Sequence, residues 1–314
     1  MLSGAPLPDP SPAAESAALA GALVPPTPER STGVHVALVI VQLAFASLAV
    51  EGKLAMSPRF GVSSLALAMV RILGGAAVFL VAHLVLRTPR VRSLRDALEL
   101  GALALFGIVI NQALFLAGLQ RTSPVAATLL TATIPVFTAL VAALAGRGRI
   151  TLRAGAGIAI AVFGIAVLSG FKAPGAGDAL VIVNAASYAI YVVFAKKMLA
   201  RYGTVTVVAW IFGWGAILFA PVGVVTLVRE APGWPAAAGG ILAFVVLVPT
   251  VIAYSVNAWA LRRAAPTLVT IYVYLQPLLV AALAWIQLGQ APPPSAAFAA
   301  PFILAGVTLV AFNR

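Results

Sequence analysis

Three polar side chains between residues 179 and 199 could together contact a small polar molecule. Asn184, Tyr188 and Tyr191 are spaced four and three residues apart, so a helix puts all three on one face. Their amide and hydroxyl groups donate and accept hydrogen bonds without carrying charge. Similar side chains interrupt other apolar stretches and complete the set of candidate binding residues: Asn111, Gln112, Trp214, Tyr254, Asn257, Tyr272 and Gln276. Such a stripe also arises where helices hydrogen-bond to one another, at about 0.6 kcal/mol per contact, and the residues alone leave both uses open.

Glu51 and Arg71 are ionisable residues deep inside apolar stretches, where a charge is costly unless it faces a partner or a cavity. Lys53 is two residues from Glu51 and therefore points to another side of the helix. This leaves Arg71, in the next stretch, as the expected partner of Glu51. The pair is either a structural ion pair or, if the two charges separate during function, a carrier of protons.

The chain lacks the groups that most enzymes and metal sites need. It has no cysteine and two histidines, which excludes thiolate and histidine-rich metal sites. Neither a pair of carboxylates nor a nucleophile with its base is present. The net charge of +12 comes from basic residues at the ends of apolar stretches, not from a polar face that could bind nucleic acid. We therefore expect no enzyme, no cofactor, no metal and no nucleic-acid partner.

The elements that must hold these residues are long apolar segments. Hydrophobic residues make up 62% of the chain and charged residues 9%, whereas a soluble domain has about 25% charged residues. A helix needs about 20 apolar residues to cross a bilayer. The sequence predicts an all-α integral membrane protein in which ten transmembrane helices cover residues 35–56, 62–86, 97–119, 124–145, 151–169, 179–199, 205–228, 235–261, 266–288 and 294–312.

Basic residues are divided unevenly between the two ends of these spans. Both terminal segments and alternate connections carry 14 of the 20 Lys and Arg residues, the other connections carry 5, and Arg71 lies inside a span. The side of a membrane protein that is rich in Lys and Arg is the cytoplasmic side. This predicts a protein of the inner membrane with both termini in the cytoplasm. Residues 1–33, rich in proline and alanine, are predicted to be a disordered cytoplasmic tail.

The two halves of the chain repeat each other at one constant offset without a gap. Residues 37–41 and 179–183 share the sequence ALVIV, and Pro124 and Pro135 recur as Pro266 and Pro277 in the same register. The predicted repeats are 34–170 and 176–314. Each holds five spans, an odd number, so the second repeat must be inverted in the membrane relative to the first. Two similar halves of opposite orientation can open a midplane site first to one side and then to the other.

Pro135 and Pro277 lie in the middle of predicted spans at matched positions of the two repeats. A proline inside a helix removes one backbone hydrogen bond and clashes with the preceding turn, so each span should kink there. The kinks are either hinges of a gate or fixed bends that shape a cavity.

These features together resemble a known family. The two five-span repeats, Lys53 and Arg71, the stretches 111–115 (NQALF) and 121–124 (RTSP), and the matched prolines are similar to those of the drug/metabolite transporter superfamily, specifically its EamA-type exporters. The resemblance covers residues 35–312. It implies export of amino acids, related metabolites or toxic compounds, and a cavity lined by the first four spans of each repeat. It also implies peripheral fifth and tenth spans, which leaves them available for pairing into a homodimer.

The sequence therefore predicts a secondary transporter in the lipid bilayer. Its expected substrates are amino acids or related small polar metabolites, exported by alternating access, with proton coupling through Glu51 as a further hypothesis. A passive facilitator or channel and a membrane scaffold without transport are the alternatives. Rings of charge typical of an ion-selective channel are missing from the spans.

Overall fold

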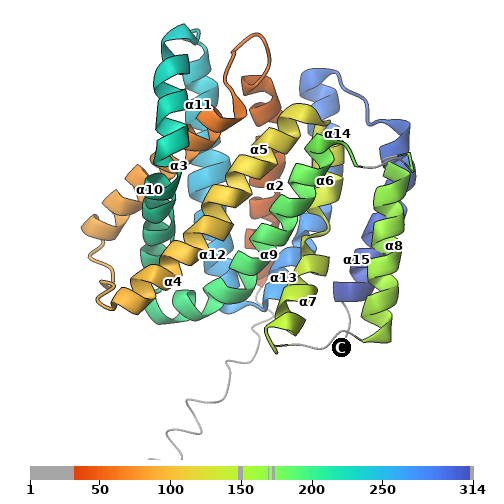
Figure 1. Ribbon diagram of the computed structural model, residues 1–314, viewed down its shortest axis with the longest axis horizontal. Coiled ribbons are helices and arrows are strands. Elements are labelled where there is room, and N and C mark those ends of the chain that lie inside the picture. The colour runs from red at the N-terminus through yellow and green to blue at the C-terminus, as the bar shows by residue number, and fades with distance from the viewer. Residues whose placement is uncertain (1–31, 148–150, 169, 172–173, 312–314) are drawn as a thin grey trace, which may run out of the picture.

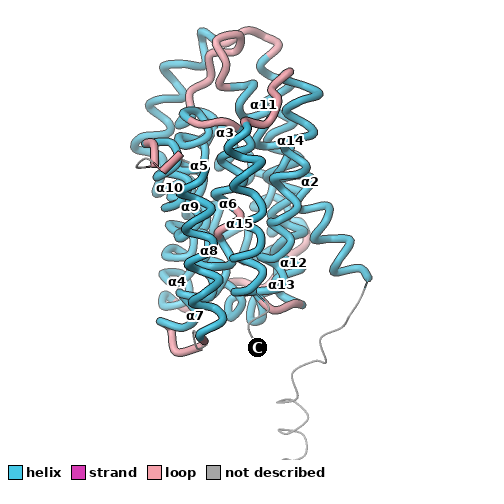
Figure 2. The backbone as a smooth tube through the Cα atoms, turned by 90° about the vertical axis from the view of Figure 1, so that its right-hand side faces the viewer, coloured by secondary structure: helices cyan, strands magenta, loops and turns pink. Residues whose placement is uncertain are grey.

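The computed structural model describes residues 32–147, 151–168, 170–171 and 174–311. Within these ranges the chain is built from helices and contains no strand, and most helices run along one common direction (Figure 2). The predicted disordered tail lies outside the described residues, apart from its last two, Thr32 and Gly33, which belong to the first described helix.

The first half of the chain supplies the elements of five predicted spans. The third of these joins two α-helices through a π-helix, and the fourth consists of two α-helices. The elements are α2 (Thr32–Ala55), α3 (Ser64–Val85), α4 (Leu94–Ala104), η1 (Leu105–Ile110), α5 (Asn111–Arg121), α6 (Pro124–Thr131), α7 (Ile134–Leu144) and α8 (Leu152–Leu168).

The second half repeats this order. Its elements are α9 (Ala176–Tyr202), α10 (Thr204–Glu230), η2 (Ala231–Gly233), α11 (Ala238–Val246), η3 (Leu247–Ile252), α12 (Ala253–Arg263), α13 (Pro266–Ile271), η4 (Tyr272–Tyr274), α14 (Leu275–Leu288) and α15 (Pro294–Ala311). The π-helix η3 corresponds to η1, and the short 3-10 helix η4 lies between α13 and α14.

Eight helical segments of the described chain are long and apolar enough to cross a membrane. Each coincides with one predicted span to within a few residues. The two other predicted spans are the shorter apolar helices α8 and α15, of 17 and 18 residues. These two helices pack against each other at one edge of the molecule (Figure 1).

Serine side chains fix the starts of several helices. Ser63, Ser93 and Ser123 each accept a hydrogen bond from the backbone amide three residues ahead, at 3.2, 3.4 and 3.1 Å. This satisfies one of the amides that a helix leaves unpaired at its first turn. At the junction of α9 and α10, Gly203 has φ +79°, a backbone conformation that L side chains rarely adopt and that permits the abrupt turn.

The offset of the sequence repeat recurs in the boundaries of the elements. The register that aligns Pro124 with Pro266 also aligns η1 with η3 at both ends, and α5 with α12 at both ends. In the same register the start of α13 matches the start of α6, and the start of α15 matches that of α8. The repeat seen in the sequence is therefore also a repeat of local backbone structure.

The contacts between the two halves are also paired. α3 packs against its counterpart α10, and α8 packs against its counterpart α15. α2 packs against α12 and α14, while its counterpart α9 packs against α5 and α7. Each of these contacts therefore recurs between the counterpart helices. Such paired contacts are typical of pseudo-two-fold symmetry.

Candidate functional site

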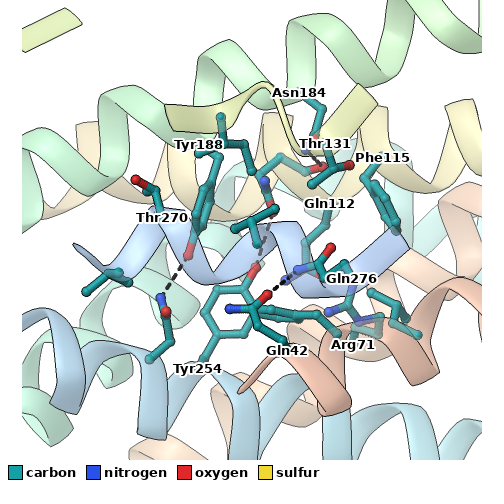
Figure 3. Close-up of a pocket in the computed structure, with 17 residues that line it drawn as sticks. Gln42, Arg71, Gln112, Phe115, Thr131, Asn184, Tyr188, Tyr254, Thr270 and Gln276 are labelled. Carbon is teal, nitrogen blue, oxygen red and sulfur yellow. Dashed lines mark hydrogen bonds between the residues drawn. The ribbon is translucent and has the colours of Figure 1, made fainter. Parts of the chain in front are cut away.

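A cavity lies between the two halves (Figure 3). It is lined by side chains from spans of both repeats, and most of them are neutral. The lining residues are Gln42, Phe45, Leu48, Arg71, Asn111, Gln112, Phe115, Thr131, Ile134, Asn184, Tyr188, Tyr254, Asn257, Val269, Thr270, Val273 and Gln276.

Many of the lining residues occur in pairs that are related by the repeat offset. Gln42 and Asn184 are one such pair, and Gln112 and Tyr254 are another. Phe115 with Asn257, Thr131 with Val273, and Ile134 with Gln276 complete the set. The cavity therefore lies where equivalent surfaces of the two repeats meet.

Hydrogen bonds cross the cavity walls from one repeat to the other. Gln276 Nε2 donates to Gln42 Oε1 at 2.7 Å, and Tyr254 OH donates to Asn111 Oδ1 at 3.2 Å. Within the second repeat, Asn257 Nδ2 donates to the Tyr188 hydroxyl at 2.8 Å. Figure 3 shows Gln42, Gln276, Tyr188 and Tyr254 pointing toward the same space. Because both partners in each of these bonds are neutral, the bonds can be exchanged for bonds to a ligand without exposing a charge.

The two π-helices turn backbone carbonyls toward neighbouring spans. The carbonyl of Phe106 in η1 accepts a hydrogen bond from Ser187 Oγ at 2.7 Å, and the carbonyl of Asn111, the residue directly after η1, accepts one from Asn184 Nδ2 at 2.7 Å. In η3 the carbonyl of Pro249 accepts a hydrogen bond from Arg71. One-turn π-helices leave carbonyls outside the regular hydrogen-bond ladder and are frequent at functional sites.

Arg71 is the charged residue among the side chains of the cavity wall, and it is 2% exposed. Its Nε donates to Thr250 Oγ1 at 3.0 Å and its Nη2 to the Pro249 carbonyl at 3.2 Å. The Thr250 hydroxyl in turn donates to the Val245 carbonyl at 2.9 Å. The guanidinium is thus anchored to η3 by neutral groups.

The predicted ion pair between Glu51 and Arg71 is wrong. Among the described residues, the ion pairs are Lys197 with Glu99 and Arg201 with Asp96, at 3.1 and 2.8 Å. Arg71 turns to η3 of the second repeat, a neighbour that cannot be identified from spacing along its own helix. Glu51 is half-buried and lies three residues beyond Leu48, so it is about one turn past the cavity on the same side of α2.

Seven of the ten predicted binding residues line the cavity, and three do not. Tyr191 lies one turn beyond Tyr188 and packs over Gly107 of η1, where a Cβ atom would come within 2.5 Å of its ring. The Trp214 indole packs over Gly101. Tyr272 is hydrogen-bonded to His35. These aromatic side chains fill space between neighbouring helices. Residue spacing along a single helix does not predict such packing.

Both spans that carry the matched prolines are interrupted just before the proline. α6 ends at Thr131 and α7 begins at Ile134, one residue before Pro135. In the second repeat the 3-10 helix η4 precedes α14, whose third residue is Pro277. The interruptions coincide with the cavity, because Thr131, Ile134, Val273 and Gln276 all line it.

Comparison with known proteins identifies the family. The family model described as the EamA-like transporter family matches residues 32–170 and again residues 175–312. The chain belongs to the EamA-like transporter family. It is therefore a membrane transporter, and the two matches coincide with the two repeats.

Several relatives of this EamA-like chain are named as transporters. An "Uncharacterized transporter" of Archaeoglobus fulgidus is 30% identical over 68% of this chain and 75% of its own length. A "Probable terminal-alkyne amino-acid exporter" of Streptantibioticus cattleyicolor is 30% identical over 80% and 84%. Protein WALLS ARE THIN 1 of Arabidopsis thaliana is 25% identical over 89% and 82%. A crystal structure with 18% identity superposes with a TM-score of 0.61, covering 90% of this chain and 99% of the other, which shows a shared fold.

Other lining residues were not predicted as binding residues from the sequence. Gln42, Thr131 and Thr270 are polar residues of the cavity wall. A signal for Gln42 was present, because it is the repeat counterpart of Asn184. Thr131 and Thr270 gave no such signal, since threonine is common in apolar helices and both hydroxyls also donate to a carbonyl four residues back. Within the described residues, no group of three or more His, Cys, Asp or Glu could hold a metal.

Proposed function

We propose that this EamA-like protein exports amino acids or related small polar metabolites by alternating access. The observation that carries the proposal is the cavity at the junction of the two repeats, which is lined by offset-related pairs such as Gln42 and Asn184. A transporter needs a midplane site that both halves share, because exchange of their shapes then opens the site to either side. The relative named as an amino-acid exporter supports this substrate class.

The proposed mechanism uses two repeats of opposite orientation, which follows if each repeat has five spans, ten in all. Two observations support this arrangement. α5 and α12 occupy corresponding places in the repeats, and Figure 1 draws α5 rising to one end of the molecule while α12 descends to the other. α8 and α15 have 17 and 18 residues, and helices of about 17–25 residues can cross a bilayer. We infer that both cross it and pair at the periphery.

The proposed orientation places both termini in the cytoplasm of a cell with an inner membrane. The start of α2 and the end of α15 lie toward the same end of the bundle (Figure 2), as an even number of spans requires. The uneven distribution of Lys and Arg assigns that end to the cytoplasm.

We further propose that Glu51 couples transport to protons without Arg71 as its partner. Four of the five carboxylates in the described chain have hydrogen bonds or ion pairs: Asp96, Glu99, Asp178 and Glu230. Glu51 has none in that part of the chain. It lies about one turn past the cavity on the cavity side of α2. A carboxylate whose access to water changes between the two states can take up and release a proton.

Counterflow in proteoliposomes tests the proposal. Vesicles loaded with unlabelled amino acids should accumulate the same labelled amino acid transiently, because a carrier returns faster when it is loaded on both sides. A channel shows no such acceleration, and a scaffold moves nothing. The cargo for this assay is chosen by growth tests of an overexpressing strain against amino acids and their analogues, since an exporter confers resistance to its own substrates.

A further inference from the structure

We infer that Arg71 is the anchor for a carboxylate of the substrate, so that the cavity selects small molecules that carry a carboxylate. This inference rests on the proposed function and narrows its substrate class. The role of Arg71 is inferred from the contacts of its side chain in this structure. Figure 3 shows that side chain in the wall of the cavity beside Gln42 and Gln276.

The first observation is that the charge of Arg71 is not neutralised by the protein. Its hydrogen-bond partners in the described residues are the Thr250 hydroxyl and the Pro249 carbonyl, both neutral. No carboxylate is among the residues that line the cavity. Ionisable groups within a membrane are costly and are retained where they pair or where they serve a ligand. Because Arg71 has no acidic partner in the described protein, we infer that its charge serves a ligand.

The second observation is that the guanidinium keeps free donors in a fixed position. A guanidinium has five N–H groups, and the two bonds to η3 use one on Nε and one on Nη2. The donors that remain include both hydrogens of Nη1. A carboxylate is bound best by two parallel N–H groups of one guanidinium. The bonds to Thr250 and Pro249 hold the plane of the guanidinium, which makes Thr250 a positioning residue.

The third observation is a buried amide oxygen without a partner. Gln112 is 1% exposed and lines the cavity, and its Oε1 has no hydrogen-bond partner in the described structure. Its Nε2 faces the Tyr254 hydroxyl, whose own hydrogen is donated to Asn111. Leaving a buried amide oxygen unpaired costs free energy, so this oxygen is available to a ligand. Its carbonyl oxygen can accept a hydrogen bond from the substrate while Arg71 holds the carboxylate.

The remaining walls define the rest of the substrate. Phe45, Phe115, Tyr188 and Tyr254 supply aromatic surface, and Leu48, Val269 and Val273 supply aliphatic surface. A cavity with one cation, neutral polar groups and apolar walls favours a monocarboxylate with a modest apolar side chain. A zwitterionic neutral amino acid fits, since its ammonium group can bind amide oxygens and aromatic faces. A substrate with net positive charge is repelled by Arg71.

The chemical accessibility of Arg71 tests the inference in the purified full-length protein. Phenylglyoxal, which reacts with arginine, is applied to the protein in lipid nanodiscs, and the adduct on the Arg71 peptide is quantified by mass spectrometry. Acetate, benzoate and L-leucine are compared with acetamide, benzamide and L-leucinamide, which have nearly the same shape but no carboxylate. We expect at least one carboxylate to slow the Arg71 reaction roughly tenfold, while its amide does not. The exposed Arg263 serves as the internal reference.

Three outcomes would overturn the inference. One is that no carboxylate protects Arg71, another is equal protection by an acid and its amide, and the third is a reactive Arg263 beside an Arg71 that never reacts. Two variants extend the test. Arg71→Lys keeps the positive charge but removes the planar guanidinium. Thr250→Val keeps the guanidinium but removes the hydroxyl that holds it in place. Both variants should lower the preference for an acid over its amide. Transport without any preference for acids would leave the proposed function standing, whereas protection without counterflow would leave an anion site in a protein that does not transport.

Discussion

The hydroxyl of Tyr188 joins two side chains of the cavity wall, since it accepts a hydrogen bond from Asn257 Nδ2 at 2.8 Å. Tyr188→Phe removes this acceptor and leaves the amide of Asn257, a buried group, without its partner. If the Tyr188 hydroxyl also bonds to the substrate, affinity should fall roughly threefold to tenfold, because a neutral hydrogen bond contributes about 0.5–1.5 kcal/mol. Membrane abundance should stay near the wild-type level. Affinity is measured by competition in the counterflow assay.

Tyr274→Phe is the matched control. The Tyr274 hydroxyl is buried without a partner, and the residue does not line the cavity. Its loss should leave affinity unchanged. Equal effects of the two variants, or loss of Tyr188→Phe protein with normal activity per molecule, would mean that Tyr188 serves packing only.

Glu51→Gln keeps the shape of the side chain but removes the proton that it could carry. If Glu51 couples transport, uptake driven by a pH gradient should fall roughly a hundredfold, the loss expected when a positioned acid or base is removed. Energy-independent exchange should remain near normal. Both activities are measured on one proteoliposome preparation, with Glu51→Asp as the control that still ionises. Full pH-driven transport by the Gln variant would exclude Glu51 as the proton carrier.

The sequence predicted residue types at this site better than residue partners. Asn184 and Tyr188 were found because their spacing on one helix is fixed by helix geometry. The partners of Arg71 were not found, because Thr250 lies 179 positions away and its approach depends on how α3 packs against the second half. Contacts between residues of different spans depend on tertiary packing. The spacing of residues within one span does not predict them.

At the scale of elements, close contact between α8 and α15 depends on glycine. A Cβ atom at Gly306 would lie 2.4 Å from the backbone nitrogen of Ala161 and 2.5 Å from the carbonyl oxygen of Gly157. Backbone atoms cannot move aside as a flexible side chain can. Gly306→Ala should therefore separate the two helices and destabilise the protein by about 1–3 kcal/mol, measured by thermal unfolding in detergent.

Gly155→Ala in α8 is the control for this prediction, because no atom lies within 4 Å of its Cβ position. In a helix, alanine is more favourable than glycine by about 0.5–1 kcal/mol, so this variant should be neutral or slightly stabilising. Equal stability of the two variants would contradict the close contact between α8 and α15.

Pro277 lies in the first turn of α14, the helix that follows the break in the ninth span. If the break is a hinge, Pro277→Ala should stiffen it and slow counterflow roughly tenfold while substrate affinity changes little, because opening and closing motions limit many transport and catalytic cycles. Pro221→Ala is the control, since Pro221 lies inside α10 with an exposed side chain and does not line the cavity. An unchanged rate together with lower affinity would indicate a fixed bend that shapes the cavity.

The element boundaries that the sequence predicted agree with the structure where composition changes sharply. Apolar runs end at Ser, Pro and Gly clusters, and the helices end there too. The π-helices could not be predicted, because one extra residue per turn leaves the apolar pattern of Leu105–Ile110 and Leu247–Ile252 unchanged. No single motif predicts that the two π-helices occupy corresponding positions in the repeats. They correspond because the two halves have the same backbone structure.

At the scale of the whole molecule, two lysines cap corresponding helices in the two repeats. Lys53 Nζ donates to the Leu119 and Thr122 carbonyls at the end of α5, both at 2.8 Å. Lys196 Nζ donates to the Ala264 carbonyl after α12 at 3.0 Å. A cation at a helix C-terminus is favourable because the last carbonyls are unpaired and carry partial negative charge. Thr122 and Ala264 are counterparts in the repeat register, so each half closes the same corner in the same way.

This correspondence leads to the prediction on which the proposed mechanism depends, the sidedness of the membrane. Alternating access through inverted repeats requires the corner at Lys53 to face outside and the corner at Lys196 to face the cytoplasm. Reporters fused after Arg314 and inserted between Arg90 and Arg95 should therefore both report the cytoplasm, while one inserted between residues 172 and 178 should report the outside. The matched control for each insertion is the level of counterflow it retains, which shows that the tagged protein is folded. If the insertion between residues 172 and 178 reports the cytoplasm in an active protein, the first half crosses the membrane an even number of times. The two repeats would then have the same orientation, and exchange of their shapes could no longer move the cavity from one side of the membrane to the other.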